Sequence, residues 1–322
     1  MVFNCPSIFG RLSDANLDWT IYGYNGRPLT RTDFPDTKIA ERTHFGTFSD
    51  FKNRAAAGTL PPYTFLEPEW GAAGNSQHPN YDVSLGEQLM LDTYRALRGS
   101  PQWNETLLLI TYDEHGGNYD HVPPPSGAAP PDDHIGEFES FDFTRFGVRI
   151  PALLISPWIP EGTVFRVTQG TIDHTSVLKT IEDRWGVPPL TQRDAAAPSL
   201  AGVLSLSAPR TDDPLENVQA PVSHPDVRRN LDLPSHIETM HAERVAALDL
   251  PNEHGFYSEQ PDPDLSTSAK IHNYIEARMQ QWDNYLQKDG RGKELRRRRS
   301  AAEKKLVAAA ALKQPRPPEN GD

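Results

Sequence analysis

The spacing of hydrophobic residues predicts several amphipathic helices. Between Asp82 and Arg98 the apolar positions recur at i, i+4 and i+7, as on one face of a helix, at Met90, Tyr94 and Leu97. Ser84 and Glu87 have the spacing of a capping box, and Gly99 follows the last turn. Further helices are predicted over residues 7–19, 173–185, 237–248 and 266–286. Residues 294–313 have high helix propensity but no sizeable apolar stripe, and they are also predicted to be helical.

Two stretches are apolar without interruption over the length of a strand, residues 106–112 ("TLLLITY") and 148–159 ("VRIPALLISPWI"). Such runs are typical of strands that are covered on both faces. A helix followed by such a strand favours an α/β fold with parallel strands. Shorter strands are predicted at "WTIYGY" and "YTFLEPEW", whereas residues 25–62 show only weak periodicity.

Proline and glycine indicate long irregular connections. The chain has 30 Pro and 22 Gly, and hydrophobic residues make up 37%, which is low for a compact domain. Residues 116–143 are Pro-rich and acidic, as in a surface lid or rim loop. Residues 197–236 are predicted to wrap the surface in an extended form, and residues 314–322 to be a disordered end.

The charge is divided unevenly along the chain. The net charge is −12, yet residues 287–322 carry 11 basic and 5 acidic side chains, while the other 286 residues carry 21 basic and 39 acidic. The acidic body argues against a nucleic-acid partner. The basic run "RRRRSAAEKK" is compatible with peripheral contact with an acidic membrane surface or RNA, although such runs are more often solvated helices or tails.

Cysteine usage and hydropathy narrow the class of protein further. Cys5 is the sole cysteine, which excludes an intrachain disulfide and a cysteine-rich zinc site. The N-terminal residues lack the pattern of a signal peptide, and no apolar run approaches the roughly 20 residues of a membrane span. We therefore expect a soluble protein without a transmembrane segment, in the cytoplasm or another intracellular compartment.

The candidate chemistry is concentrated in "LLLITYDEHGGNYDHVPPP", residues 107–125. Asp113 and Glu114 follow the predicted strand directly, and ligands of open α/β sheets bind beyond the carboxyl ends of the strands. Two adjacent carboxylates offer hard oxygen ligands to a divalent metal ion, and Gly116 and Gly117 permit close backbone approach. A helix cap or a loop salt bridge would place acids here equally well.

Three histidines are candidates for catalytic work, namely His78, His121 and His174. Each side chain is able to donate a hydrogen bond to a phosphate oxygen or to protonate a leaving group. A lone histidine is more often structural, but several near the strand ends of one sheet favour a functional role. For the arginines Arg149, Arg184 and Arg193, salt bridges with the many acids are favoured over phosphate binding.

At these residues the sequence resembles a known family. "HPNYDVSLGEQLMLDTYRALRGSPQWNETLLLITYDEHGGNYDHVPPP", "FTRFGVRIPALLISPWIPEGTV" and "DHTSVLKTIEDRWG" are similar, in this order, to motifs of the phosphoesterase family that contains non-specific phospholipases C and a class of acid phosphatases. The resemblance implies an alkaline-phosphatase-like fold, a large mixed sheet flanked by helices. It implies that Asp113 and Glu114 are ligands of a divalent metal ion of unknown identity. It also implies that His78 contacts the phosphate of a phospholipid or phosphomonoester substrate.

The sequence also departs from the family pattern. The family usually begins with an "ENRSFDH"-like motif, and a Thr or Ser before a "PNR"-like turn is its nucleophile; neither motif is found here. We therefore expect a domain truncated at its N-terminal side over residues 1–220, followed by a wrapping segment with helices over 221–286 and a basic helical or disordered tail over 287–322. The expected function is phosphoester hydrolysis, impaired by the missing groups. The alternatives are a non-catalytic remnant that binds a phosphorylated ligand or a protein partner, and a basic-tailed interaction protein.

Overall fold

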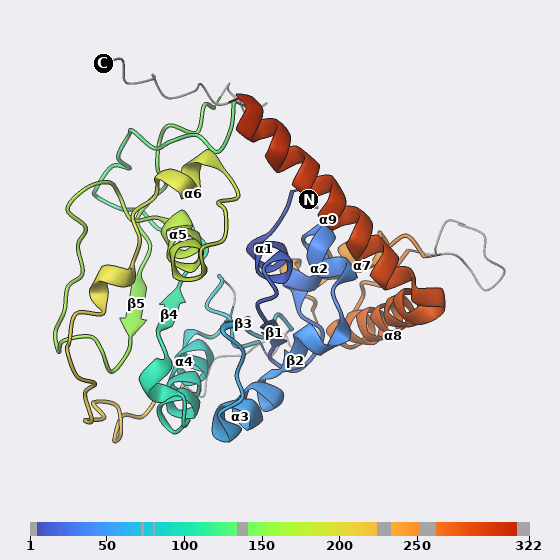
Figure 1. Cartoon of the computed structure of the whole chain (residues 1–322). Helices are drawn as coiled ribbons and strands as arrows, with labels where there is room; N and C mark the ends of the chain where they lie inside the picture. The colour runs from blue at the N-terminus through green and yellow to red at the C-terminus, as the bar shows by residue number, and fades with distance from the viewer. Residues whose placement is uncertain are drawn as a thin grey trace, which may run out of the picture.

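The computed structural model is an α/β protein with two small sheets and helices packed around them (Figure 1). It describes residues 5–71, 74–79, 81–133, 141–223, 233–250 and 262–313. The strands are β1 (Trp19–Gly23), β2 (Phe45–Thr47), β3 (Tyr63–Leu66), β4 (Leu108–Thr111) and β5 (Ala152–Ile155). The α-helices are α1 (Ile8–Asp14), α2 (Pro35–Ile39), α3 (Phe48–Ala57), α4 (Val83–Arg98), α5 (His174–Trp185), α6 (Gln192–Ala196), α7 (His236–Ala246), α8 (Ser268–Gln287) and α9 (Arg291–Lys313).

The first sheet is parallel, as the sequence predicts for an α/β fold. Its strand order is β2-β1-β3, and every residue of the central strand β1 is buried. Apolar side chains of α1 and α5 pack with β1 in one core that includes Phe9, Trp19 and Ile181. Helix α1 begins after Ser7, whose side chain accepts a hydrogen bond from the amide of Gly10.

The second sheet differs from the prediction in direction and in burial. β4 and β5 pair antiparallel, with Leu109 opposite Leu154, and form a separate two-stranded sheet and not part of one large sheet. The strands are only partly buried, and Leu153 is 54% exposed. The prediction of a covered parallel pair is therefore wrong, because an apolar run reports a preference for burial but not the direction of the partner or what covers it.

Helix α4 confirms the strongest helix prediction, with one correction at its cap. It spans Val83–Arg98 and buries Leu91, Tyr94 and Leu97. The N-cap is Asp82, whose carboxylate accepts a hydrogen bond from the amide of Ser84, so the predicted capping box of Ser84 and Glu87 is wrong. An Asp two residues earlier in the chain offers a stronger acceptor at the helix start.

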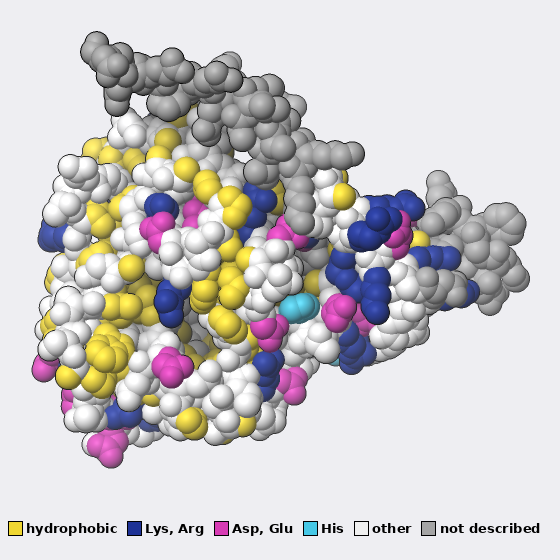
Figure 2. All heavy atoms as spheres, in the orientation of Figure 1, with side chains coloured by type: hydrophobic (Ala, Val, Ile, Leu, Met, Phe, Trp, Pro, Cys, Tyr) yellow, Lys and Arg dark blue, Asp and Glu magenta, His cyan; other side chains and the backbone are white. Residues whose placement is uncertain are grey.

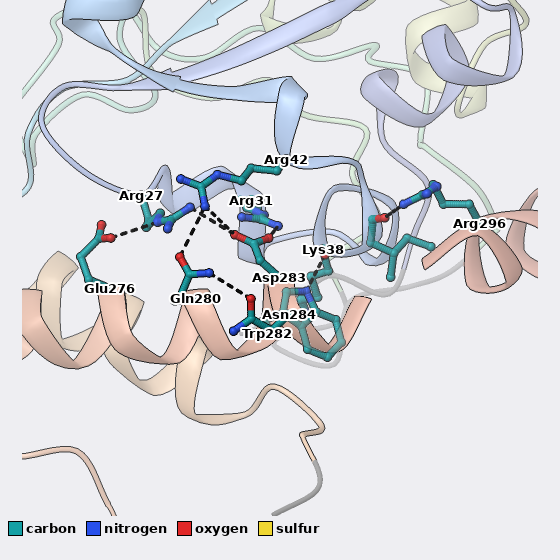
Figure 3. A network of polar contacts seen from close by, with 11 residues as sticks. Arg27, Arg31, Lys38, Arg42, Glu276, Gln280, Trp282, Asp283, Asn284 and Arg296 are labelled. Atoms are coloured by element: carbon teal, nitrogen blue, oxygen red, sulfur yellow. Dashed lines mark hydrogen bonds and ion pairs between the residues drawn. The ribbon is translucent and has the colours of Figure 1, made fainter. Parts of the chain in front are cut away.

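The C-terminal helices α7, α8 and α9 pack around a core of their own, which includes Val245, Ile271 and Trp282. A polar network fastens α8 to the N-terminal half of the chain (Figure 3). Arg31 and Asp283 form a fully buried ion pair, and Asp283 also accepts a hydrogen bond from Arg27 at 3.3 Å. The indole N–H of Trp282 donates to the carbonyl of Lys38 at 2.6 Å.

Helix α9 confirms the predicted helix over 294–313 and extends it by three residues at its N-terminal side. It packs against α2 (Figure 1), where Arg296 donates to the carbonyl of Ile39 at 2.7 Å. The described part of the basic segment is therefore a docked helix. The predicted disordered end, residues 314–322, lies outside the described residues, as does part of the predicted wrap. No helix among the described residues is both long and apolar enough to cross a membrane.

Candidate functional site

The two acids of the candidate site lie where the sequence places them, just beyond the carboxyl end of β4. The Asp113 carboxylate accepts a hydrogen bond from the amide of Glu114 at 3.0 Å, and the Glu114 carboxylate accepts one from the amide of Gly116 at 2.6 Å. Both acids are exposed. Gly116 and Gly117 have φ values of 65° and 72°, a left-handed turn that glycine adopts without strain.

Tyr112 connects this acidic turn to two other parts of the chain. Its carbonyl accepts a hydrogen bond from Nε2 of His174, the first residue of α5, at 2.9 Å. Its hydroxyl donates to the side-chain oxygen of Gln77. Because Gln77 precedes His78, both contacts of Tyr112 bring a predicted histidine segment to the end of β4.

The loop of His78 lies next to the glycine turn. A Cβ atom added to Gly116 would lie 3.8 Å from Cγ of Pro79. Nδ1 of His78 is 2.8 Å from the carbonyl of Pro79, which can only accept a hydrogen bond. This contact assigns the proton to Nδ1 and leaves Nε2 as the acceptor in the neutral ring.

His121 is placed differently from the other two histidines. Its side chain is 83% exposed and its Nδ1 lies 3.7 Å from the Asp120 carboxylate. Asp120 is held in turn by a two-bond contact with Arg149, at 2.8 and 2.9 Å. The Arg149 guanidinium holds the pKa of the Asp120 carboxyl well below its usual range. Within the described ranges, His121 forms no hydrogen bond or ion pair with Asp113 or Glu114.

The acidic pair has the donor chemistry of a hard divalent cation. Each carboxylate uses one oxygen for a backbone amide, which fixes its position, and the second oxygen of each takes part in no described hydrogen bond. Two adjacent carboxylates fit part of a Mg²⁺-like or Ca²⁺-like ligand set, which prefers oxygen. Over the described residues, no group of three or more His, Cys, Asp or Glu side chains is arranged to hold a metal ion.

A pocket of about 740 Å³ opens beside the turn. His115 of the acidic turn is among its lining residues, together with Phe141, Phe143, Phe146, Arg145 and Arg193. Arg193 is fixed there by the Asp173 carboxylate, with N···O distances of 3.0 and 2.9 Å. The salt-bridge interpretation of Arg149 and Arg193 is therefore confirmed.

The residues that sequence reasoning missed are those that join the segments. Tyr112 and Gln77 lie 35 positions apart, and neither has a recognisable motif of its own. Asn118 was also missed, although its side chain donates to the carbonyl of His115 at 3.0 Å and so closes the glycine turn. The signal that was present for Asn118 is its place directly after two glycines, where side-chain amides commonly stabilise a turn.

A model of the Phosphoesterase family matches residues 1–188, which is more than half of the chain. The chain belongs to the phosphoesterase family. It is 45% identical over 224 residues to "Non-specific phospholipase C6" of Arabidopsis thaliana, which covers 65% of this chain and 43% of the relative. It is 38% identical over 233 residues to "Non-specific phospholipase C4" of the same plant, covering 68% of this chain and 43% of the relative.

A phospholipase of Mycobacterium tuberculosis is similar as well. "Phospholipase C B" of Mycobacterium tuberculosis (strain ATCC 25618 / H37Rv) is 31% identical over 231 residues, covering 62% of this chain and 43% of the relative. The chain thus spans less than half the length of the curated relatives it matches. The family assignment confirms the resemblance carried by the "DEHGG", "GVRIP" and "DHTS" motifs of this sequence.

Proposed function

We propose that this phosphoesterase takes part in hydrolysis of phospholipid phosphate esters, with Asp113 and Glu114 as ligands of a divalent metal ion. The observation that carries the proposal is the exposed carboxylate pair at the end of β4, beside the His78 loop and the N-terminus of α5. Its relatives named phospholipase C support phospholipid as the substrate class. The second candidate substrate for the same chemistry is a phosphomonoester.

Each residue has a role that its contacts support. Asp113 and Glu114 would hold the ion, which, when bound, supplies positive charge at the phosphoryl oxygens. His78 keeps its Nδ1 proton on Pro79, so its Nε2 is the atom that accepts a proton from, or returns one to, the substrate. His174 uses Nε2 to hold Tyr112, which leaves Nδ1 for the substrate. His121 has the weakest support, because its contacts lead to Asp120.

From the family resemblance we also propose that the fold of this chain is related to that of the alkaline-phosphatase superfamily. The two-carboxylate arrangement also gives specific support to the alternative, a chain that binds a phosphorylated ligand without turnover. Over the described residues the acidic pair has no third acidic, histidine or cysteine partner. Metal affinity from two carboxylates is low, so we propose that hydrolysis by this chain alone is weak.

The deciding experiment measures metal binding and hydrolysis on the same variants. Asp113→Asn removes one anionic ligand and is expected to weaken Mn²⁺ binding, measured by calorimetry, by at least about tenfold. Release of the phosphorylated head group from short-chain phosphatidylcholine is expected to fall in parallel. Asp183→Asn is the matched control, because Asp183 is an exposed acid on α5 that pairs with Lys179.

The outcomes separate the two functions. Metal-dependent hydrolysis that Asp113→Asn abolishes and Asp183→Asn preserves supports the enzyme. The non-catalytic alternative is supported if Asp113→Asn weakens metal binding while neither the parent protein nor the variants hydrolyse the lipid. Unchanged metal binding in Asp113→Asn contradicts both, because the acidic pair would then hold no ion.

A further inference from the structure

The pocket beside the acidic turn is lined by an aromatic cluster whose rings are not fully buried. Phe141, Phe143 and Phe146 come from one stretch of six residues, and Phe141 is 37% exposed. The rings of Phe141 and Phe143 pack edge to face with centroids 5.0 Å apart. Three phenyl groups around an open pocket leave apolar surface in contact with water, which is unfavourable unless a ligand covers it.

Phe143 is held in a strained backbone conformation at this pocket. Its φ is +61°, a region that bulky residues with a Cβ avoid. Asn16 is the other described residue besides glycine with positive φ, and asparagine tolerates that region far better. Backbone strain of this kind persists only where surrounding contacts enforce it, and it is concentrated at functional sites.

The side chain of Arg193 contacts this strained residue directly. Its Nη1 donates to the carbonyl of Phe143 at 3.1 Å, and its guanidinium lies 5.0 Å from the centre of the Phe146 ring. Asp173 holds the other side of the same guanidinium and also caps α5. One arginine therefore fixes two of the three phenylalanines to the helix that begins with His174.

The pocket is consequently part of the same framework as the acidic turn. His115 lines the pocket and directly follows Glu114. His174 directly follows Asp173 and holds the carbonyl of Tyr112, which precedes Asp113. The volume of about 740 Å³ lies within the range of small-molecule sites. Figure 2 shows hydrophobic side chains gathered over the half of the molecule that contains β4, β5 and α5.

We propose that this aromatic pocket binds an acyl chain of the phospholipid, so that Phe141, Phe143 and Phe146 form the acyl subsite. The inference rests on the proposed function, since it takes the phosphate of the same lipid to lie at Asp113 and Glu114. The guanidinium of Arg145 lies 5.7 Å from the centre of the Phe141 ring, and this cation–π contact helps to hold the ring at the pocket. The affinity of the protein for a phospholipid then depends on the acyl chain as well as on the head group.

Calorimetry with two probes tests this inference without turnover. The probes are dihexanoyl phosphatidylcholine, kept below its micelle concentration, and glycerophosphocholine, which has the same head group and no acyl chains. Both are titrated into the Asp113→Asn protein. The lipid is expected to bind at least about tenfold more tightly, because apolar area is buried only when acyl chains are present.

Three variants locate the binding. Phe141→Ala and Phe143→Gly are each expected to weaken lipid binding roughly tenfold. Glycine at position 143 removes the ring but keeps the positive φ without strain. Phe65→Ala is the matched control, because Phe65 is 36% exposed, like Phe141 at 37%, and does not line the pocket. Circular dichroism of each variant confirms that the fold is retained.

The results distinguish this inference from the proposed function. Equal affinity for the two probes, or equal weakening by Phe65→Ala, overturns the acyl subsite even if the parent protein hydrolyses phospholipid. Acyl-dependent binding that the pocket variants weaken supports the subsite even if the parent protein hydrolyses nothing. In that second case the proposed catalysis fails while the lipid site stands.

Discussion

At the scale of single residues, a buried pair of carboxyl groups joins α5 to α6. Glu182 is 4% exposed, and Asp194 is fully buried. Asp194 accepts hydrogen bonds from the amides of Leu190 and Thr191 at 2.6 and 2.8 Å, and these fix its carboxyl group beside Glu182. Burial, and then the neighbouring Asp194, raise the pKa of Glu182 to about 8. Glu182 is therefore protonated in the folded chain at neutral pH.

This pair predicts a stability that falls as the pH rises. The unfolded chain loses the Glu182 proton near its ordinary pKa of about 4.3, whereas the folded chain keeps it up to about pH 8. The contribution of Glu182 is therefore fully present below about pH 4 and decreases between these two values, by up to roughly 1.4 kcal/mol per pH unit. Glu182→Gln, which keeps a donor toward Asp194, is expected to remove this slope and to be the more stable protein at pH 7.

Urea unfolding at several pH values between 5 and 8 checks the prediction. Asp183→Asn serves as the control, since it removes the adjacent exposed carboxyl and leaves the buried pair intact. The control should keep the pH dependence of the parent chain. If Glu182→Gln and the parent chain show the same slope, the assigned proton on Glu182 is wrong.

At the scale of elements, the attachment of α8 depends on one buried acid. Asp283 is 3% exposed and neutralises Arg31, which is completely buried (Figure 3). Burial lowers the pKa of Arg31, and the hydrogen bond with Asp283 opposes that change. Removing one partner of a buried ion pair leaves the other charge without compensation in a low-dielectric environment.

We therefore expect Asp283→Asn to lower the free energy of unfolding by about 3–5 kcal/mol. Urea unfolding monitored by circular dichroism measures the loss. Asp264→Asn is the matched control, because Asp264 pairs with Lys270 at the surface just before α8 begins. The control should leave the unfolding midpoint close to that of the parent chain. A midpoint for Asp283→Asn that matches the control would show that the network does not hold α8.

The elements also show which structure was predictable from sequence. Helices α4 and α5 have a strong apolar stripe and clear caps, so they were predicted to within a few residues. Helix α3 was missed, because residues 25–62 have weak periodicity, although Thr47 and Asp50 form a capping box and Gly58 ends the helix at φ 64°. The antiparallel partner of β4 was not predictable, since strand pairing depends on contacts distant in sequence.

The candidate site divides in the same way. The acidic turn is local, because consecutive residues and two glycines determine it, and the sequence predicts it in place. The contact of His174 with Tyr112 joins residues 62 positions apart, and the carbonyl of Phe143 accepts a hydrogen bond from Arg193, 50 positions away. Such contacts follow from tertiary packing, so no local sequence pattern predicts them.

At the scale of the whole molecule, basic side chains gather on the C-terminal helices of an acidic protein. Figure 2 shows Lys and Arg side chains together over α8 and α9. Within the run of four arginines, Arg296 pairs with Glu41 at 3.0 Å and Arg299 lies 3.5 Å from Asp36. Arg297 and Arg298 take no part in this docking: their side chains are 75% and 73% exposed, and both pair with Glu294 on the same helix, at 2.9 and 2.6 Å. The run thus serves two purposes, attachment of α9 and exposed positive charge.

The difference between docked and exposed arginines allows a specific test of the predicted membrane contact through the basic segment. Deleting residues 287–322 would also remove the docking contacts of α9. Changing Arg297 and Arg298 together to glutamine keeps those contacts and removes two exposed charges together with their surface pairs to Glu294. Since each basic residue near an anionic surface strengthens binding, we expect the double variant to bind phosphatidylserine-rich vesicles roughly fivefold more weakly per charge removed. Pure phosphatidylcholine vesicles should distinguish the parent and variant little, and added salt should reduce the difference.

The matched control replaces Lys52 and Arg166 by glutamine, which changes the net charge equally at exposed positions outside the C-terminal helices. Vesicle co-sedimentation measures binding of all three proteins. Equal weakening by the two double variants would mean that only the net charge of the chain matters. Selective weakening by the Arg297 and Arg298 changes would place α9 against the membrane. The same surface would then supply the lipid that we propose binds at the acidic turn and the aromatic pocket.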